Sequence, residues 1–487
     1  MRNSFSKHVL ATATLLVLAS GSVLAADAPK SSLPIPERFS WASSDASATT
    51  ASEAQFWRSF GDARLSALVD RALSENHDLR IAYARFESAN AMLRGARFDR
   101  LPTVTAAASA SDSRLSTDQA PGLSRDDRDS KSYDVGAQLS WELDLFGRVR
   151  KGVQAQRADA DAAARDLQAM QVTIVAEVAR DYIELRGLQQ RLRVAQDNAA
   201  SQEETLRLVE AGFRAGHGTE FDTARARSQL ESTSARVPAL ESEIAATMHH
   251  LAVLVGQPPE ALIADLKSPE PLPALPAGVS PGTPGDLLRR RPDVAAAESR
   301  LVSATARVGV AKADLFPRFT LGGLFGAQAA SAGSLFGRDG ETHLVALGID
   351  WSFLNFGRVR ARLAAAHADA DGELARYEQT VLRALEETEN ALVRFDNART
   401  EDQQLTNAAI DSAKAAQLAR IRYEAGAADL FEVLDAERSN LQAQDAAAQG
   451  RTRSFTDLIS VYKALAGGWP TQLPVKVTAI AGNASGG

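Results

Sequence analysis

The sequence contains no cysteine among its 487 residues, which excludes disulfide bonds and thiolate-ligated metal ions and leaves no side chain for a lipid anchor. Aromatic residues make up only 6% of the chain, which favours thin helix-on-helix packing over thick globular cores. After residue 26 there is no run of about 18 apolar residues, so we expect no transmembrane helix.

Signatures of enzymes and of nucleic-acid binding are also missing. The net charge is −7 and the basic residues are scattered, so no nucleic-acid partner is expected. Neither a nucleophile elbow nor a phosphate-binding loop is present. His249 and His250 are adjacent in a predicted helix, where their side chains point about 100° apart and make a poor metal pair. The sequence therefore predicts a protein that is not an enzyme and has no cofactor and no metal site.

One stretch of the chain occurs twice. Ser140–Arg150, SWELDLFGRVR, is repeated as Asp350–Arg360, DWSFLNFGRVR. The similarity extends from residue 133 to about residue 240 at a constant offset, and residues 76–102 match 291–317 without a gap. Such a unit is far longer than a solenoid repeat, so it indicates a duplicated half-protein.

Each half combines a strand pair with long helices. Apolar residues alternate with polar ones from Tyr133 to Leu143 and again from Val345 to Phe353, as in strands with one apolar face. Each alternating segment runs into a stretch that lacks proline as far as Pro238 or Pro470, which favours long helices. The fold class is therefore mainly α with a small β part. The strands are expected at about 103–111, 133–144, 318–326 and 343–354, the long helices at 148–215, 220–255, 358–425 and 429–465, and shorter helices at about 52–99 and 292–314.

The chain divides in sequence at its ends and in its middle. Residues 1–26 have the charged start, apolar centre and small-residue end of a signal peptide, with Ser22 where a lipoprotein would carry a lipidated cysteine, so we expect no lipid anchor. Eight of the 18 prolines lie between Pro258 and Pro284, which indicates a linker. The expected organisation is a signal peptide at 1–26, a first repeat at 27–257, a linker at 258–284, a second repeat at 285–466 and a tail at 467–487.

The four predicted strands are too few to close a barrel, since about eight are needed before the interior can even be filled. Exposed hairpins with an apolar face tend to aggregate. The strands therefore either cover a helix or combine with those of other chains in a membrane barrel. The signal peptide, the strand ends rich in aromatic residues and the polar hairpin loops favour the barrel.

Several stretches resemble outer-membrane efflux proteins, in the branch that works with resistance–nodulation–division pumps. They are FWRSFGD at 56–62, DLLRRRPD at 286–293, AKADLFP at 311–317 and both FGR joints. The resemblance implies a homotrimer in outer-membrane lipid, with a 12-stranded β-barrel continuous with a periplasmic α-barrel. It also implies an equatorial belt, a periplasmic adaptor and an inner-membrane pump as partners.

The tips of the two predicted helical hairpins hold the candidate site. Thr219 with Asp222, and Asp429 with Glu432, are spaced like capping boxes, and capping alone is a full alternative explanation for Asp222 and Glu432. The resemblance implies that the acids at these tips surround a cation-selective periplasmic aperture and that the bonds of a tyrosine help to hold it shut. The corresponding residues are Asp222, Tyr423, Glu432 and Asp435. Some family members carry an arginine that helps to close the aperture where this chain has Ala428, and Arg422 would take its role here.

The two FGR joints have a structural explanation. Gly147 and Gly357 would permit a sharp turn from strand to helix, and the side chains of Arg148 and Arg150 would extend to the inner interface of the membrane. Arg358 is the corresponding residue of the second joint. The function that the sequence favours is an outer-membrane exit duct that conducts drugs or other small molecules passively. A duct for type I protein secretion remains an alternative, and so does a periplasmic coiled-coil adaptor, which would lack the two strand pairs.

Overall fold

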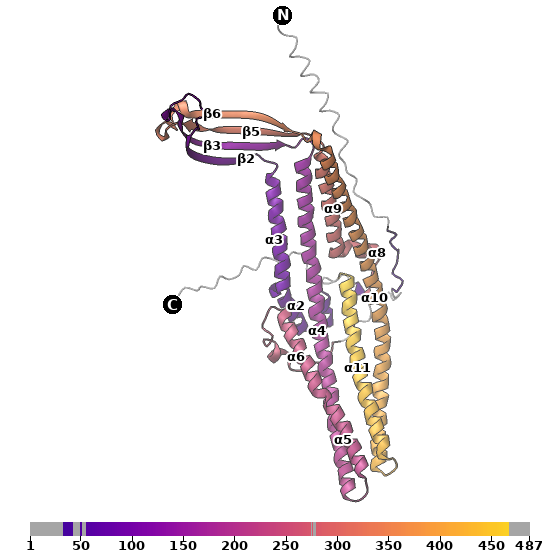
Figure 1. The fold of residues 1–487 in the computed structure, drawn as a ribbon. Helices are drawn as coiled ribbons and strands as arrows, with labels where there is room; N and C mark the ends of the chain where they lie inside the picture. Colours follow the sequence, from indigo (N-terminus) through magenta and orange to yellow (C-terminus); the bar gives the residue numbers. More distant parts are fainter. Residues whose placement is uncertain (1–32, 42–48, 51–54, 274, 276–278, 467–487) are drawn as a thin grey trace. The chain divides into compact units, whose positions relative to one another are not determined.

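The computed structural model describes residues 33–41, 49–50, 55–273, 275 and 279–466. The expected signal peptide, Ser22 and the tail from residue 467 lie outside these residues. The described elements follow the order in Figure 1, and their bounds are η1 Phe56–Phe60, α2 Ala63–Glu75, α3 His77–Phe98, β2 Thr103–Arg114, β3 Asp129–Leu143, α4 Arg148–Arg214, α5 Glu220–Ser234, α6 Arg236–Leu254, α7 Ile263–Leu266, α8 Pro284–Arg290, α9 Pro292–Ala313, β5 Arg318–Ala329, β6 Glu341–Asp350, η5 Phe353–Asn355, α10 Phe356–Glu424 and α11 Leu430–Ala464.

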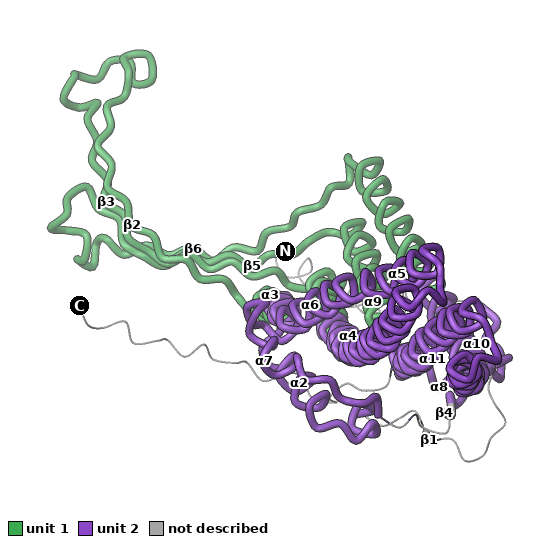
Figure 2. The backbone as a smooth tube through the Cα atoms, turned by 90° about the horizontal axis from the view of Figure 1, so that it is seen from below, with its two compact units in different colours: residues 1–32, 86–163, 296–378 green, residues 33–85, 164–295, 379–487 purple. Residues whose placement is uncertain are grey.

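Two compact units divide the chain (Figure 2). The first contains residues 86–163 and 296–378, and the second contains residues 33–85, 164–295 and 379–487. Both units draw on both halves of the sequence, so the duplicated halves are not separate domains. In the described part of the chain, no helix has the length and apolar character needed to cross a membrane.

The first unit contains one antiparallel sheet with the strand order β2-β3-β5-β6. The hairpin β2-β3 comes from the first half of the sequence and β5-β6 from the second, and they join where Trp141 of β3 pairs with Leu321 of β5. Residues of β2 and β6 are almost all exposed, and the apolar side chains of Val345, Leu347 and Ile349 are each more than 60% exposed. Among the residues that the structure describes, neither edge strand of this sheet, β2 or β6, pairs with a further strand.

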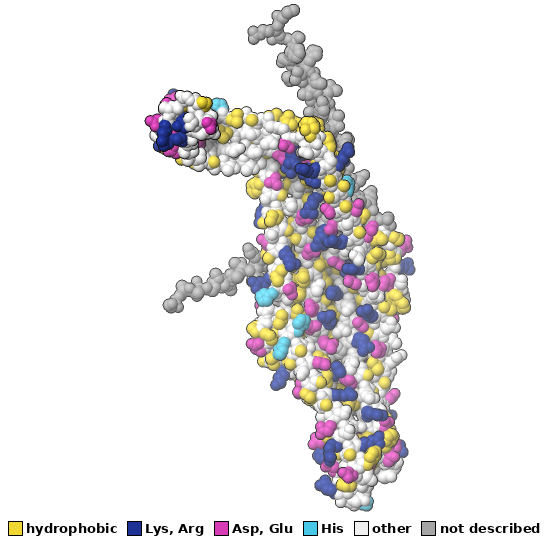
Figure 3. Space-filling view, in the orientation of Figure 1, with side chains coloured by type: hydrophobic (Ala, Val, Ile, Leu, Met, Phe, Trp, Pro, Cys, Tyr) yellow, Lys and Arg dark blue, Asp and Glu magenta, His cyan; other side chains and the backbone are white. Residues whose placement is uncertain are grey.

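Charged side chains lie at the ends of this sheet more than along it. Figure 3 shows dark blue and magenta side chains gathered on the loops at the far end of the strands, whereas the strands between carry mostly white and yellow atoms on this face. Such an uncharged band between polar ends is the pattern of strands that face lipid.

The duplication can be followed side chain by side chain in the first unit. Leu93 of α3 packs against Val153 and Ala160 of α4, while at the equivalent places Val308 of α9 packs with Leu363 and Ala370 of α10. The indole nitrogen of Trp141 donates to Arg100 O at 3.1 Å, and that of Trp351 donates to Leu315 O at 3.2 Å. These matched contacts fix the start of each strand pair against the preceding helix.

The second unit has an aromatic core where the start of the described chain meets its end. The ring of Phe56 in η1 stacks on Tyr462 of α11 with centroids 4.6 Å apart, and Phe60 meets Phe455 edge-on at 6.0 Å. Trp57 is 1% exposed beside them. These aromatic rings hold the short segment η1 against the long helix α11.

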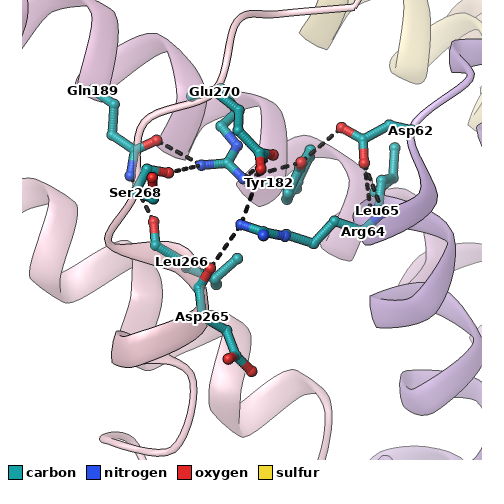
Figure 4. A network of polar contacts seen from close by, with 10 residues as sticks. Asp62, Arg64, Leu65, Tyr182, Gln189, Asp265, Leu266, Ser268 and Glu270 are labelled. Carbon is teal, nitrogen blue, oxygen red and sulfur yellow. Dashed lines mark hydrogen bonds and ion pairs between the residues drawn. The ribbon is translucent and has the colours of Figure 1, made fainter.

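A polar network ties the linker between the halves to α4 (Figure 4). Arg186 has no exposed side-chain surface; it donates to Glu270 Oε2 at 2.7 Å, Ser268 O at 2.9 Å and Gln189 at 2.8 Å. Tyr182 donates to Asp62 at 2.7 Å, and burial raises the pKa of its phenol well above the ordinary value. The proline-rich linker is therefore anchored by charge-assisted hydrogen bonds in addition to its buried apolar side chains, Leu262 and Leu266.

The element bounds differ from expectation most clearly at three places. The helix predicted at about 52–99, with a break near Asp62, is divided twice, into η1, α2 and α3, because both Asp62 and Asn76 cap new helices. The return helix expected at 220–255 is interrupted at Ala235, three residues before Pro238, since a proline disturbs the helical turn that precedes it. The last strand ends at Asp350 and not at residue 354, and η5 follows it. The expectation of a strand through Phe353 is wrong.

Candidate functional site

The turn between α4 and α5 is the first hairpin tip. Gly216 has φ +82° and closes the end of α4, with its N–H donating to Phe213 O at 3.0 Å. Thr219 and Asp222 then form a complete capping box, in which Asp222 accepts from Thr219 N at 3.0 Å. The carboxylate of Asp222 is thus used locally, as the spacing of the two residues predicts.

The turn between α10 and α11 has the same backbone and different side-chain chemistry. Gly426 has φ +72° and its N–H donates to Tyr423 O at 2.9 Å. Asp429 caps α11 by accepting from Glu432 N at 2.9 Å. The carboxylate of Glu432 does not return to the cap but pairs with Arg422, which also donates to Ala427 O at 3.3 Å. Arg422 therefore links the end of α10 to the start of α11 within one chain.

Asp435 lies one turn further along α11 and pairs with Arg438 of the same helix. Its side chain is 46% exposed, and that of Glu432 is 41% exposed. Both acids thus face solvent in the single chain with an arginine beside each. At such exposure an ion pair contributes little to stability, so these carboxylates remain available to other ligands.

An apolar cluster joins the two tips. Val209 of α4, Ala226 of α5, and Leu430 and Leu434 of α11 are buried together, with Tyr423 packed against them. Within the described residues of this one chain, no hydrogen bond joins the hydroxyl of Tyr423 to Asp222. The structure brings Tyr423 to the contact between the hairpins but leaves Asp222 in its cap.

The two strand-to-helix joints differ. Gly147 has φ +79°, Arg148 pairs with Glu142 at 2.5 Å, and Asp144 caps α4 by accepting from Val149 N at 3.0 Å. Gly357 is instead the second residue of α10 and has no positive φ, and Arg358 follows it in the helix. The expectation that Gly357 itself makes the sharp turn is wrong, because η5 turns the chain before it.

A hydrogen-bond cluster above the tips was missed by the sequence reasoning. Arg420 of α10, Thr205 of α4 and Glu437 of α11 meet in it, and Glu437 is only 6% exposed. The sequence did contain one signal for this cluster: the charged residue Glu437 lies among the apolar residues of the helix predicted at 429–465. As for metals, the residues that the structure describes include no group of three or more potential metal-binding side chains.

The family model for outer membrane efflux proteins matches residues 68–257 and 283–467, which is most of the chain and both repeats. Outer membrane protein OprJ of Pseudomonas aeruginosa is 35% identical over 423 residues, covering 85% of this chain and 86% of that protein. The pyoverdine export outer membrane protein OpmQ of Pseudomonas putida is 34% identical, covering 88% and 92%.

Solved structures agree with these relatives. The outer-membrane channel OprN has a TM-score of 0.83 at 42% identity, covering 91% of this chain and 99% of that one. The open MtrE channel of Neisseria gonorrhoeae has a TM-score of 0.79 at 29% identity, covering 92% and 99%. The family consists of channel proteins and not of enzymes, which also decides against a coiled-coil adaptor.

The fold is that of trimeric channels with duplicated halves, which reside in the outer membrane, extend into the periplasm and work in tripartite pumps with an adaptor and an inner-membrane transporter. The chain belongs to the outer membrane efflux protein family and is an outer-membrane channel of an efflux pump.

Proposed function

We propose that this channel is a passive exit duct for small organic molecules, which an adaptor and an energised inner-membrane pump open and supply. The names of its relatives support this substrate class, since they include proteins for pyoverdine export, solvent efflux and toluene efflux. They favour small-molecule efflux over type I protein secretion. The duct itself needs no catalytic group.

The observation that carries the proposal is the sheet with two open edges. Its four strands alternate in direction, so β6 of one copy can pair with β2 of the next and continue the antiparallel alternation. Three copies then close a ring of twelve strands, the product of three and the four in each sheet. Since about eight strands give a filled interior, a ring of this size leaves an opening.

We place the periplasmic aperture of the duct at the hairpin tips. Three chains would bring three copies each of Glu432 and Asp435 together, and close carboxylates repel unless cations or protons relax them. Arg422 and Arg438 reduce this repulsion within each chain. Tyr423 and Asp222 would restrain the contact between neighbouring hairpins.

In the proposed trimer, both repeats of each chain contribute one strand pair and one helical hairpin. The first repeat is at 27–257 and the second at 285–466, and the linker at 258–284 contributes to the equatorial belt. The joints at Gly147 and Arg148, and at Gly357 and Arg358, would lie at the periplasmic surface of the membrane, where arginine side chains reach the polar headgroups.

Complementation tests the function. The chain would be expressed with a cognate adaptor and pump in a Gram-negative host that lacks its own efflux duct, and susceptibility to dyes, solvents and antibiotics measured. We expect resistance to small organic molecules only when an active pump is present. Export of a co-expressed type I secretion substrate, without any gain of resistance, would contradict the proposal.

A further inference from the structure

A pocket lies where the joint between β3 and α4 meets α9. Its volume is about 320 Å³, at the lower end of the range for ligand sites. Two cations, an amide, an aromatic ring and two glycines line it, namely Arg150, Lys151, Gln154, Phe146, Gly147 and Gly309. No acidic side chain is among these lining residues, so the pocket is suited to an anion.

Close contacts between the two repeats shape this pocket. A Cβ at Gly309 of α9 would lie 3.0 Å from Lys151 Cδ of α4, so a larger residue at this position would displace the lysine side chain. The ring of Phe146 stacks on Phe316, which follows α9, with centroids 4.6 Å apart. The glycine therefore provides the space, and the stacked rings fix the joint against the end of α9.

The positive charge of the pocket is only partly neutralised. Arg150 Nε lies 3.3 Å from Asp144 Oδ2. The Lys151 ammonium donates to Gln154 Oε1 at 3.1 Å and has no carboxylate partner in the described part of the chain. Asp144 also accepts from Val149 N at 3.0 Å and from Arg150 N at 2.9 Å, so the start of α4 is already capped and the site consists of side chains. Two cations and one carboxylate leave one positive charge, which matches the single negative charge of a phosphodiester.

The Arg150 side of α4 is the side of the apolar face of the sheet. Glu142 lies opposite Thr320 on the polar face, and Arg148 turns back to pair with Glu142 at 2.5 Å. Arg150 follows Arg148 by two residues, about 200° around the helix, so it leaves α4 on nearly the opposite side. Since side chains alternate along a strand, that is the side of Trp141, next to Glu142.

We propose that this pocket binds the phosphate of a phospholipid from the periplasmic leaflet of the outer membrane, one for each chain of the trimer. The inference rests on the proposed function, which puts the joints at the periplasmic surface of the membrane. There a basic pocket meets anionic headgroups, and the apolar side of the strands meets acyl chains. Leu145, the residue before Phe146, is 59% exposed and offers an acyl chain an apolar contact. Figure 3 shows dark blue side chains gathered where the sheet meets the helices.

The site occurs once in each chain, although the joint occurs twice. In the second copy Ala361 and Ala364 stand where the first has Lys151 and Gln154, whereas Arg360 repeats Arg150. Arg360 is exposed, as Arg150 is. It is therefore a matched control, because it carries the same charge at the equivalent place without the lysine and the amide.

Titration of phosphatidylglycerol into the detergent-solubilised trimer, followed by native mass spectrometry, tests the site. We expect one tightly bound lipid for each chain, and Lys151→Gln should weaken this binding about fivefold, the contribution of one basic residue near an anionic lipid surface. Lys151→Arg keeps the charge and should bind like the unmodified trimer, and so should the control Arg360→Gln. Arg150→Gln removes the other cation and should also weaken binding, so the test stands even if Lys151→Gln fails to assemble.

Two further ligands separate the possible sources of the phosphate. Inorganic phosphate at matched ionic strength should not displace the lipid, and uncharged diacylglycerol should not bind in its place. Displacement by inorganic phosphate would make this a site for the free ion, and equal binding of diacylglycerol would make it an apolar surface. Either result overturns the proposal, and so does an equal loss of binding in Arg360→Gln and Lys151→Gln.

Failure of the lipid site is distinguishable from failure of the proposed function. If the chain confers resistance in the complementation assay but its trimer binds no phosphatidylglycerol, the exit duct stands and the lipid site is wrong. If the lipid binds as expected and no resistance appears with an active pump, the site stands and the proposed duct is wrong.

Discussion

The two hairpin tips share a backbone and differ in what their acids do. In both, a glycine with positive φ ends the first helix and the next N–H reaches back to the helix, His217 to Gly212 O at 3.0 Å and Ala427 to Arg422 O at 2.8 Å. At the first tip, Asp222 completes a capping box. At the second, Asp429 caps alone and Glu432 is paired with Arg422.

This difference separates a feature that both copies share, the backbone turn, from one that differs between them, the side-chain contacts. The turn is fixed by backbone hydrogen bonds and a glycine, so both copies retain it. The side chain at the third helical position is free to change once another residue caps the helix. At the second tip this position holds Glu432, which forms an exposed ion pair with Arg422. The second tip is therefore the better candidate for an aperture.

The largest effect is expected from removing the exposed acids of the second tip. Glu432→Ala with Asp435→Ala leaves Arg422 and Arg438 without their carboxylate partners. We expect the trimer to lose cation selectivity and block by multivalent cations, and to shift toward anions, in single-channel recordings. The matched variant at the first tip, Asp222→Asn, keeps the cap and should keep the selectivity. Unchanged selectivity and block in the double variant would show that these acids only support their helix.

A smaller effect is expected from loosening the contact between tips. Tyr423→Phe removes a hydroxyl but leaves the ring on Leu434 and Val209, so stability should change by no more than about 0.5 kcal/mol. Combined with Asp222→Asn, it should raise conductance if the two side chains restrain neighbouring hairpins. Asp222→Ala is a less clean probe, because it also removes the Asp222 half of the capping box. Wild-type conductance in the Tyr423→Phe, Asp222→Asn variant would remove both residues from the gate.

The buried cluster of Arg420, Thr205 and Glu437 predicts a dependence of stability on pH. The pKa of Glu437 is raised in the folded chain by burial, and the charged groups that face it are Arg420 of α10 and Glu204 of α4. The folded state therefore binds this proton more tightly than the unfolded state, so the stability contribution of Glu437 increases as pH falls through its raised pKa. The contact with Arg420 weakens over the same window. On mild acidification the apparent melting temperature of the trimer should therefore rise relative to that of Glu437→Gln, which cannot take up this proton; an equal response of the two proteins would contradict the prediction.

Most of the architecture could be predicted from the sequence because it rests on local rules. The alternation before Trp141 and Trp351, the proline-free helices and the repeated FGR stretches each specify their own segment. Matching the two copies then predicts a shared fold, which the paired indole hydrogen bonds confirm.

The rest depends on contacts between distant segments. No local pattern brings Arg186 to Glu270, or Arg420 to Thr205 and Glu437, because each pair is fixed only when helices pack. Spacing predicted that Asp222 caps α5, and it does. The spacing could not predict that Glu432 pairs with Arg422 instead of completing a capping box, since Arg422 and Glu432 lie on different helices.

The two joint glycines give the finest test of how far the halves are equivalent. Gly147 has φ +79°, and an added Cβ would also meet the Arg150 side chain at 3.4 Å. Gly147→Ala should therefore cost about 1–2 kcal/mol, the strain of a left-handed backbone for an ordinary residue. Gly357 is helical, and the position that an alanine Cβ would take there is open space. Gly357→Ala should instead stabilise by up to about 1 kcal/mol, as alanine does in helices. Denaturant unfolding of the two variants in detergent measures the difference, and effects of the same sign would mean that both joints turn alike after all.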